Sequence, residues 1–304
     1  MGGSTYNPHD VGGDTLLRVS KSSFIGYAKC PRRYWWDKIA LPDVMSPSSP
    51  EAERGRAIHA VMEDGLTSAT MNLSTDIASD YLFDLDMNKA AAEHEVEGDI
   101  GVTALADILG AVAEAWDGLE ILEMEVKHEV PYAFAHVWLD EEGGTQQPHY
   151  PVVLVGMIDA VFRMPDGGIC IVELKTGSAN EGKLSRTRKE LAYYRMLYHA
   201  VHGEQATHFL TIFPDATDPN FLTKMMNKRN TEVFMGAAQG LAVLEKVGKR
   251  TVSSMFTTLH NSIHGIMTHE WPIKWNEYFC TQWCDYHLSC SEQMLGVAED
   301  ITMG

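Results

Sequence analysis

The chain has 304 residues, of which 45% are hydrophobic and 22% are charged, and this composition is typical of a folded globular protein rather than a disordered or fibrous one. It carries 42 acidic and 24 basic residues, for a net charge of −18, so the protein as a whole should repel nucleic acid and anionic membranes. No apolar run reaches the roughly 18 residues of a membrane helix, and the start of the chain lacks a basic and apolar leader. We therefore expect a cytoplasmic protein without a membrane partner. Any binding to phosphate groups must then depend on a locally basic part of the surface.

The first part of the chain predicts an arm, a helix and a linker. Residues 1–19 are rich in glycine, serine and threonine and predict a flexible arm. A helix should follow, capped by Ser20 or Ser22 and continuing to Trp35. A segment rich in proline and serine, residues 42–50, predicts the linker that ends this unit.

The middle of the chain changes from helical to extended patterns. Residues 53–67 place apolar side chains on one helical face, and the alanine, leucine and glutamate content from about 68 to 120 predicts a helical insert. Extended runs follow at 122–139, 150–164 and 169–175, the last two joined by the turn Pro165-Asp166-Gly167-Gly168. These runs predict three antiparallel strands.

The last part of the chain completes a mixed fold. We predict a helix at 185–202, a strand at 206–213, a helix at 231–247 and a tail with three cysteines at 275–292. The succession of helix, three strands, helix and strand predicts an α/β protein with a single domain over residues 20–304.

Charge is distributed unevenly along the sequence. Residues 61–180 hold 23 acidic and four basic residues, whereas two segments are basic. The basic residues of these segments are Lys29, Arg32, Arg33 and Lys38, and Lys183, Arg186, Arg188, Lys189 and Arg195. Both clusters are candidates to follow a phosphate backbone, with Trp35, Trp36 or Tyr193 stacking on bases, and solvated helix faces are the alternative interpretation.

Acidic side chains near the second and third predicted strands indicate a metal site. Asp159 interrupts the apolar run at 152–162, where an unpaired buried carboxylate would be costly. On the next strand Glu173 and Lys175 share one face, and pairing through the turn should bring Asp159 close to Glu173. Two adjacent carboxylates favour Mg²⁺ or Mn²⁺, with His59 as a further ligand. The alternative is a salt-bridge network at the end of the sheet.

Four of the five cysteines indicate a second, softer site. Cys280, Cys284 and Cys290 lie close together in the tail, and Cys30 lies about 250 residues upstream. Four thiolates suit either Zn²⁺ or an iron–sulfur cluster, and the spacing does not separate the two; unligated thiols are the remaining alternative. Cys170, among apolar neighbours, is interpreted as a core residue.

These motifs, taken in order, resemble a known family. They are Ser20 to Phe24, Cys30-Pro31-Arg32-Arg33-Tyr34, Gly55 to His59, Gly156-Met157-Ile158-Asp159, Glu173-Leu174-Lys175-Thr176-Gly177, Glu190-Leu191-Ala192-Tyr193-Tyr194 and the cysteine tail. The sequence resembles the RecB-like branch of the PD-(D/E)xK nucleases, in particular its iron–sulfur members, such as the CRISPR-associated exonucleases and the AddB nuclease domain. The resemblance implies a restriction-endonuclease-like fold, with a mixed sheet flanked by helices, a helical insert, and terminal segments stapled by the cluster.

The resemblance also implies roles for individual residues. His59, Asp159 and Glu173 would bind the catalytic metal, with the backbone carbonyl of Leu174 as a further ligand, and Lys175 would orient or activate the attacking water. Glu190 and Tyr194 fall on a motif that carries glutamine and tyrosine in the family, so this chain departs from it at Glu190. Cys30, Cys280, Cys284 and Cys290 match the ligands of a 4Fe-4S cluster that joins the two chain ends.

The implied function is metal-dependent hydrolysis of DNA. The expected enzyme is a Mg²⁺- or Mn²⁺-dependent deoxyribonuclease, an exonuclease on single strands or free ends, in repair, recombination, phage replication or CRISPR adaptation. Arg32, Arg33, Arg186, Arg188 and Lys189 would contact DNA. Two alternatives stay open: an inactive nuclease-fold subunit that binds DNA ends in a repair or adaptation complex, and a zinc-stabilised protein-interaction domain.

Overall fold

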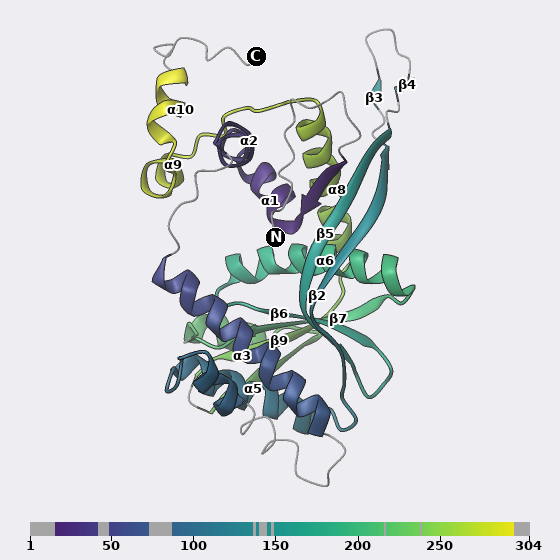
Figure 1. The fold of residues 1–304 in the computed structure, drawn as a ribbon, viewed down its shortest axis with the longest axis vertical. Coiled ribbons are helices and arrows are strands. Elements are labelled where there is room, and N and C mark those ends of the chain that lie inside the picture. Colours follow the sequence, from purple (N-terminus) through teal and green to yellow (C-terminus); the bar gives the residue numbers. More distant parts are fainter. Residues whose placement is uncertain are drawn as a thin grey trace. The chain divides into compact units, whose positions relative to one another are not determined.

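The computed structural model of the chain describes residues 16–41, 49–72, 87–135, 138–139, 145–146, 149–215, 217–237 and 239–294. The chain forms two compact units (Figure 1). Residues 1–46, 131–154 and 256–304 make up the first unit, and residues 47–130 and 155–255 the second. Three elements continue from one unit into the other: β2 (Glu120–Ala135), β5 (His149–Arg163) and α8 (Lys249–Met267). The sequence predicts one domain over 20–304, and the structure adds this division within it.

The second unit is built on a mixed sheet. Its further strands are β6 (Ile169–Leu174), β7 (Ala206–Phe213), β8 (Thr231–Met235) and β9 (Leu241–Lys246). The strand order is β1-β5-β6-β7-β9-β8, with β1 (Leu17–Ser20) from the first unit and with β2 also paired to β5. β6 and β7 are parallel, whereas β5 with β6, β7 with β9, and β8 with β9 are antiparallel. The predicted α/β fold with a mixed sheet is confirmed.

The turn between β5 and β6 sets the register that matters for the site. The backbone N–H of Gly168 donates to the Asp166 carboxylate at 2.9 Å, and Gly167 adopts a positive φ of 82°, which glycine permits without a Cβ clash. The turn pairs Arg163 with Ile169 and Ala160 with Val172. Asp159 precedes Ala160 and Glu173 follows Val172, so these two residues lie just beyond the last pair of this register.

Helices cover both faces of this sheet. Figure 1 shows α3 (Pro50–Asn72) and α5 (Ile100–Ala115) on one side of the strands and α6 (Glu181–His202) on the other. The core on the α3 side combines buried residues of both helices with Cys170, Val172 and Leu174 of β6. Because strand side chains alternate, Glu173 points to the opposite face, toward α6. A smaller cluster joins α7 (Pro219–Met226) to the start of α6.

Several predicted elements are confirmed and others are corrected. The helix at 53–67 is part of α3, the strand at 206–213 is β7, and the helix at 185–202 begins four residues earlier than predicted. The predicted helical insert contains α5 and a helical segment at 87–93, and its residues 73–86 lie outside the described residues.

The helix predicted at 231–247 is wrong, because this segment forms the antiparallel pair β8 and β9. Gly240 has a φ of 78°, and a Cβ on Gly236 would lie 2.5 Å from the backbone oxygen of Gln239. These two glycines interrupt a segment whose alanine and leucine content favours a helix, and pairing of β9 with both β7 and β8 then outweighs local propensity. The helix at this end of the chain is α8, which the sequence analysis missed.

The first unit contains most of the N- and C-terminal helices. They are α1 (Lys21–Lys29), α2 (Pro31–Trp35), a π-helical turn (Trp36–Ala40), α9 (Glu277–Trp283) and α10 (His287–Met294), with the short strands β3 (Trp138–Leu139) and β4 (Thr145–Gln146). Ser20 caps α1 as predicted, since its Oγ accepts from the backbone N–H of Ser23 at 3.2 Å. The predicted single helix breaks at Cys30, which is extended, because a residue before proline disfavours the helical conformation.

The predicted flexible arm at 1–19 is too long. Leu17 and Val19 are buried in β1, with exposed fractions of 2% and 0%, so the chain is a strand from Leu17 onward. The alternation of apolar Leu17 and Val19 with polar Arg18 and Ser20 is typical of a strand with one buried face. Residues 1–15 and most of the predicted linker, residues 42–48, lie outside the described residues.

Hydrogen bonds tie the N-terminal helices of the first unit to its C-terminal segments. The hydroxyl of Tyr27 donates to the backbone oxygen of Glu270 at 2.5 Å, and the hydroxyl of Ser262 donates to that of Phe24 at 2.9 Å. The ring of Trp36 stacks on that of Tyr286, with 5.5 Å between ring centroids. Segments about 240 residues apart in sequence therefore form one core. Among the described residues, no helix is long and apolar enough to cross a membrane.

Candidate metal centre

Three side chains from three elements of the second unit converge on one position. His59 lies on α3, Glu125 on β2 and Asp159 on β5. Nδ1 of His59 is 3.4 Å from a carboxylate oxygen of Glu125 and 3.7 Å from one of Asp159. One possible ligand atom from each residue lies within 4.8 Å of the other two. One imidazole and two carboxylates form an oxygen-rich donor set of the kind that suits Mn²⁺ and Mg²⁺.

The local structure around His59 and Asp159 explains their placement. A Cβ on Gly55, one turn before His59, would lie 3.1 Å from the hydroxyl of Thr176, so glycine here lets α3 approach the end of β6 closely. Asp159 is only 5% exposed, and its carboxylate accepts the backbone N–H of Leu174 at 2.8 Å. This hydrogen bond offsets part of the cost of burying the carboxylate.

Glu125 is the site residue that sequence reasoning missed. It has a positive φ of 46°, which is uncommon for a residue other than glycine. The alternation of acidic and apolar residues at 123–126 predicts a half-exposed strand, and it does not reveal this change in backbone direction. The sequence offers one indication of its role, which is that Glu125 is a carboxylate in the predicted strand that precedes the strand of Asp159.

The predicted residues Glu173 and Lys175 lie beside each other. Nζ of Lys175 is 2.5 Å from a carboxylate oxygen of Glu173 and 2.7 Å from one of Glu190. Glu173 is 1% exposed, whereas the Lys175 side chain is 22% exposed and reaches solvent. Glu173 is not a member of the three-ligand group formed by described residues around His59. Glu125 thus joins His59 and Asp159 in this group, and the assignment of Glu173 as a metal ligand stays a prediction.

The electrostatic field of this centre is strongly negative. Burial alone would lower the pKa of His59, but the hydrogen bond to Glu125 and the charges of Asp159, Glu125 and Glu173 outweigh it and raise the pKa. Burial, followed by the charges of Glu173, Asp159 and Glu190, also raises the pKa of Tyr194 well above its ordinary value. Such a field attracts a cation.

A separate ion-pair network fixes the chain that follows β6. Arg54 of α3 donates to both carboxylate oxygens of Asp99 at 2.7 and 2.8 Å, and to Asp215 at 2.8 Å. Asp215 in turn accepts the backbone N–H of Gly177. The hydrogen bond from Arg54 lowers the pKa of Asp99. This network connects α3, which carries His59, to the turn just after Lys175.

Some of the basic residues predicted to contact DNA form hydrogen bonds within the protein, and others are exposed to solvent. In the second unit, Arg188 donates to both oxygens of Glu245 at 2.6 and 2.9 Å, while Arg186 is exposed and Lys189 partly exposed. In the first unit, Arg33 donates to the backbone oxygen of Trp283 at 3.5 Å, and the guanidinium of Arg32 lies 5.4 Å from the ring of Trp35.

The aromatic residues expected to stack on bases are largely engaged within the protein. Tyr193 is fully buried and donates to the backbone oxygen of Val155 at 3.1 Å, and Trp35 is 9% exposed. Trp36 stacks on Tyr286. The expectation that Tyr193 stacks on a base is therefore wrong, because its ring is inaccessible.

The four predicted cluster cysteines all lie in the first unit, and none of these four described residues forms a disulfide. Burial raises the pKa of Cys284, and the thiols of Cys280 and Cys30 raise it further. The pKa of Cys290 is likewise raised by burial and then by Cys284 and Cys30. Among the described residues, no cysteine belongs to a group of three ligand atoms within 4.8 Å. Cys170 is fully buried in the second unit, as expected of a core residue.

Comparison with known proteins gives a family assignment. The family model described as "PD-(D/E)XK nuclease superfamily" matches residues 18–291, and the mixed sheet flanked by helices is consistent with that fold. A solved structure described as "Crystal structure of SSO0001" is similar over 93% of this chain and 89% of that chain, with 13% identity and a TM-score of 0.38. No curated protein matches. With a family model matching most of its length, the chain belongs to the PD-(D/E)XK nuclease superfamily.

Proposed function

We propose that the chain is a Mg²⁺- or Mn²⁺-dependent deoxyribonuclease whose metal ligands are His59, Glu125 and Asp159. The observation that carries this proposal is the convergence of these three side chains from α3, β2 and β5 within 4.8 Å. Membership of a nuclease superfamily supports it independently. Glu173 and the backbone carbonyl of Leu174 are further candidate ligands, because the charge of Glu173, like that of Asp159, contributes to the raised pKa of His59.

A bound ion in this centre would supply Lewis-acid stabilisation of the phosphate and a lowered pKa for its bound water. Lys175 would orient the attacking water or neutralise charge on the phosphate, because its side chain is partly exposed while Glu173 and Glu190 fix its position. Glu190 holds Lys175 from α6, and Tyr194, one turn later on the same helix, packs against β5 at Gly156. Glu190 and Tyr194 are therefore positioning residues in this proposal.

The proposed substrate is DNA with a free end, preferably single-stranded, which makes the enzyme an exonuclease. Arg186 and Lys189 at the start of α6 support contacts with the phosphate backbone in the second unit, because both are accessible. Arg32 and Arg33 are the corresponding candidates in the first unit. Arg188 contributes less directly in this proposal, since Glu245 already neutralises it.

We also propose that Cys30, Cys280, Cys284 and Cys290 bind a 4Fe-4S cluster with a structural role, as in the RecB-like iron–sulfur nucleases. Two features support this. After burial, the nearby thiols of Cys280 and Cys30 raise the pKa of Cys284, and those of Cys284 and Cys30 raise the pKa of Cys290. Contacts between Arg33 and Trp283 and between Trp36 and Tyr286 also join the segment after Cys30 to the C-terminal helices. A cluster at this position would lock the two ends together.

The nuclease proposal is tested with end-labelled single-stranded DNA, blocked at either the 5′ or the 3′ end, incubated with Mn²⁺, Mg²⁺ or EDTA. We expect metal-dependent release of nucleotides from one end, reduced at least about 100-fold in Lys175→Ala and Asp159→Ala. Glu129→Gln, an exposed position on β2, is the matched control and should cleave like the unaltered chain. Cleavage that persists in both site variants would refute the site, and DNA binding without cleavage would favour an inactive end-binding subunit.

The cluster proposal has its own test. Protein purified without oxygen should be brown, with an absorbance band at about 400 nm, and Cys284→Ser should lose the colour and the bound iron. Cys170→Ala is the control, because Cys170 is buried in the second unit, and it should retain both. Zinc in place of iron in the unaltered protein would instead favour a zinc-stabilised segment.

A further inference from the structure

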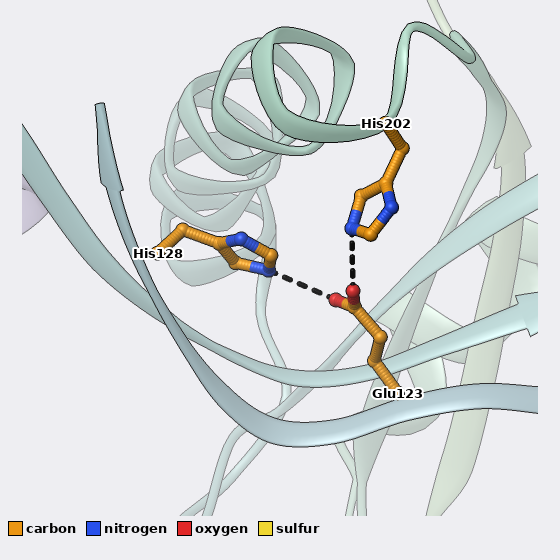
Figure 2. A group of neighbouring side chains, drawn as sticks. All are labelled: Glu123, His128 and His202. Atoms are coloured by element: carbon orange, nitrogen blue, oxygen red, sulfur yellow. Dashed lines mark hydrogen bonds and ion pairs between the residues drawn. The ribbon is translucent and has the colours of Figure 1, made fainter. Parts of the chain in front are cut away.

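A second group of metal-binding side chains lies in the second unit, with no residue in common with the centre around His59. Figure 2 shows the carboxylate of Glu123 between the imidazoles of His128 and His202, which both point toward it. Nε2 of His128 is 2.9 Å from one carboxylate oxygen, and Nε2 of His202 is 2.6 Å from the other. One ligand atom from each of the three residues lies within 4.8 Å of the other two.

The backbone of β2 creates this cluster. Glu123 and His128 are five positions apart, and in a regular strand an odd spacing puts two side chains on opposite faces. Glu125 lies between them with a φ of 46°, which interrupts the alternation and lets both side chains meet on one side. The same irregular residue thus supplies a carboxylate to His59 and aligns Glu123 with His128.

The third member comes from the end of a helix. His202 is the last residue of α6, and Gly203 ends the helix with a φ of 74°. The last carbonyl groups of a helix carry partial negative charge and favour a nearby cation. His202 lies about two turns after Tyr194 on α6, so this helix carries residues of both centres.

Burial and charge make the cluster suited to a cation. The His128 side chain is 4% exposed and that of Glu123 is 11% exposed, whereas His202 is 36% exposed. The ring centroid of Tyr198 is 4.4 Å from that of His202. Burial, followed by the charges of Glu204, Glu123 and Glu120, raises the pKa of Tyr198, and the charge of Arg163 opposes this shift. Arg163 is engaged by both Glu120 and Glu204, at 3.1 and 3.3 Å. Three carboxylates against one guanidinium leave this region negative.

We propose that Glu123, His128 and His202 bind a divalent transition-metal ion, with Zn²⁺ strongly preferred over Mg²⁺. Two imidazole nitrogens and one carboxylate oxygen are a donor set that suits Zn²⁺, and Mg²⁺ prefers oxygen ligands and retains its water. Binding replaces the hydrogen bonds of both imidazoles to Glu123 with bonds to the ion. The exposed side, at His202, leaves a fourth position for water.

The proposed ion would join α6 to β2. α6 carries Glu190 and Tyr194, and β2 carries Glu125. An ion bound at the C-terminal end of α6 would therefore fix the two elements that present these residues. This role is structural, and it does not require the chain to be a nuclease.

The test compares Zn²⁺ binding in His202→Gln with that in His199→Gln. His199 is an exposed histidine in the last turn of the same helix, so its variant controls for loss of a surface imidazole. Metal-free protein is titrated with Zn²⁺ against a chromophoric chelator in millimolar Mg²⁺. We expect the unaltered chain and His199→Gln to bind one more equivalent than His202→Gln, or to bind it at least about tenfold more tightly. Zn²⁺ should also raise the melting temperature of the first two proteins more than that of His202→Gln.

A measurement on the unaltered chain covers the case in which His202→Gln does not fold. Crystals grown with one equivalent of Zn²⁺ per proposed site should give an anomalous difference peak, at the zinc absorption edge, between Glu123, His128 and His202. Equal Zn²⁺ binding by a folded His202→Gln, or no anomalous peak among the three side chains, would overturn the proposal. The cluster would then be only a hydrogen-bond network.

Discussion

Glu190 accepts a hydrogen bond from Lys175, with 2.7 Å between Oε2 and Nζ. A glutamine at this position could accept the same bond, because both side chains carry an acceptor oxygen. The geometry therefore gives the position a definite task here, which is to hold the ammonium of Lys175 from α6 while Glu173 holds it from β6.

Glu190→Gln should preserve most of the activity. The amide oxygen can still accept from Lys175, but a neutral acceptor is weaker than a carboxylate, so we expect single-turnover cleavage to fall by about fivefold or less. Glu190→Ala removes a charge-assisted bond of about 1.5–3 kcal/mol and should slow cleavage by about 10- to 100-fold. Glu181→Gln, at the exposed first turn of α6, should change nothing. Equal losses in Glu190→Gln and Glu190→Ala would mean that the negative charge matters and the hydrogen bond does not.

Glu125→Gln tests whether Glu125 or the sequence-predicted residue Glu173 completes the metal site with His59 and Asp159. If Glu125 is a ligand, isothermal titration should show Mn²⁺ affinity reduced at least about tenfold, since one of two close carboxylates is neutralised. Glu129→Gln on the same strand should bind Mn²⁺ like the unaltered chain. Unchanged affinity in Glu125→Gln combined with a loss in Glu173→Gln would restore Glu173 as the ligand and assign Glu125 to the support of His59.

As pH rises, deprotonation of His59 should lower the unfolding free energy of the metal-free protein and increase its affinity for Mn²⁺. Its pKa in the folded chain is raised above the ordinary 6.5, so in metal-free protein the protonated imidazole stabilises the fold below about pH 6.5, and this contribution is lost as pH rises through the raised pKa. Binding of Mn²⁺ requires the neutral imidazole and should strengthen over the same pH increase.

Urea unfolding in EDTA at several pH values measures the first effect, and Mn²⁺ titration measures the second. His59→Gln should remove the extra stability at low pH and flatten both profiles, whereas His199→Gln should leave them as in the unaltered chain. A stability difference between the unaltered chain and His59→Gln that does not shrink as pH rises would contradict the assigned direction of the pKa shift.

Asp99→Asn tests the network that fixes the turn after β6. Hydrogen bonding to Arg54 lowers the pKa of Asp99, so its contribution is present above about pH 3.8 and is lost as pH falls through the lowered pKa. We expect unfolding free energy at neutral pH to fall by about 1–3 kcal/mol, with the difference from the unaltered chain narrowing in acid. Glu97→Gln, exposed two residues away, should have little effect at any pH.

The sequence predicted the parts of the site whose placement depends on local patterns. Asp159 in an apolar run, a tight turn and Glu173 two residues before Lys175 are enough to fix a β-hairpin and its register, and β6 and β5 pair as expected. His59 required only a helical face and a nearby glycine. Each of these inferences uses spacing within one element or across one turn, where periodicity is informative.

The parts that could not be predicted depend on pairing between distant segments or on an irregular backbone. Glu125 lies next to His59 because its backbone has a positive φ, and the pattern of apolar and polar residues does not predict this angle. The hairpin of β8 and β9 forms because β9 also pairs with β7, where Leu241 lies opposite Phe213, 28 residues earlier in the sequence. The helix α8 was not predicted, although the buried residues Met255, Leu259 and Ile263 follow a helical spacing.

Gly156→Ala should reveal how closely α6 must approach β5. A Cβ at Gly156 would lie 2.6 Å from Leu197 Cδ1 and 2.9 Å from Tyr194 Cε1, so the helix must shift, at a cost of about 1–3 kcal/mol in unfolding free energy. Because Tyr194 and Glu190 lie on the same helix, cleavage should fall along with stability. Gly26→Ala in α1 meets no atom within 4 Å and should instead stabilise the chain by about 0.5–1 kcal/mol without affecting cleavage. Stability and activity in Gly156→Ala equal to those of the unaltered chain would show that α6 tolerates displacement, and its position would then not be what holds Lys175.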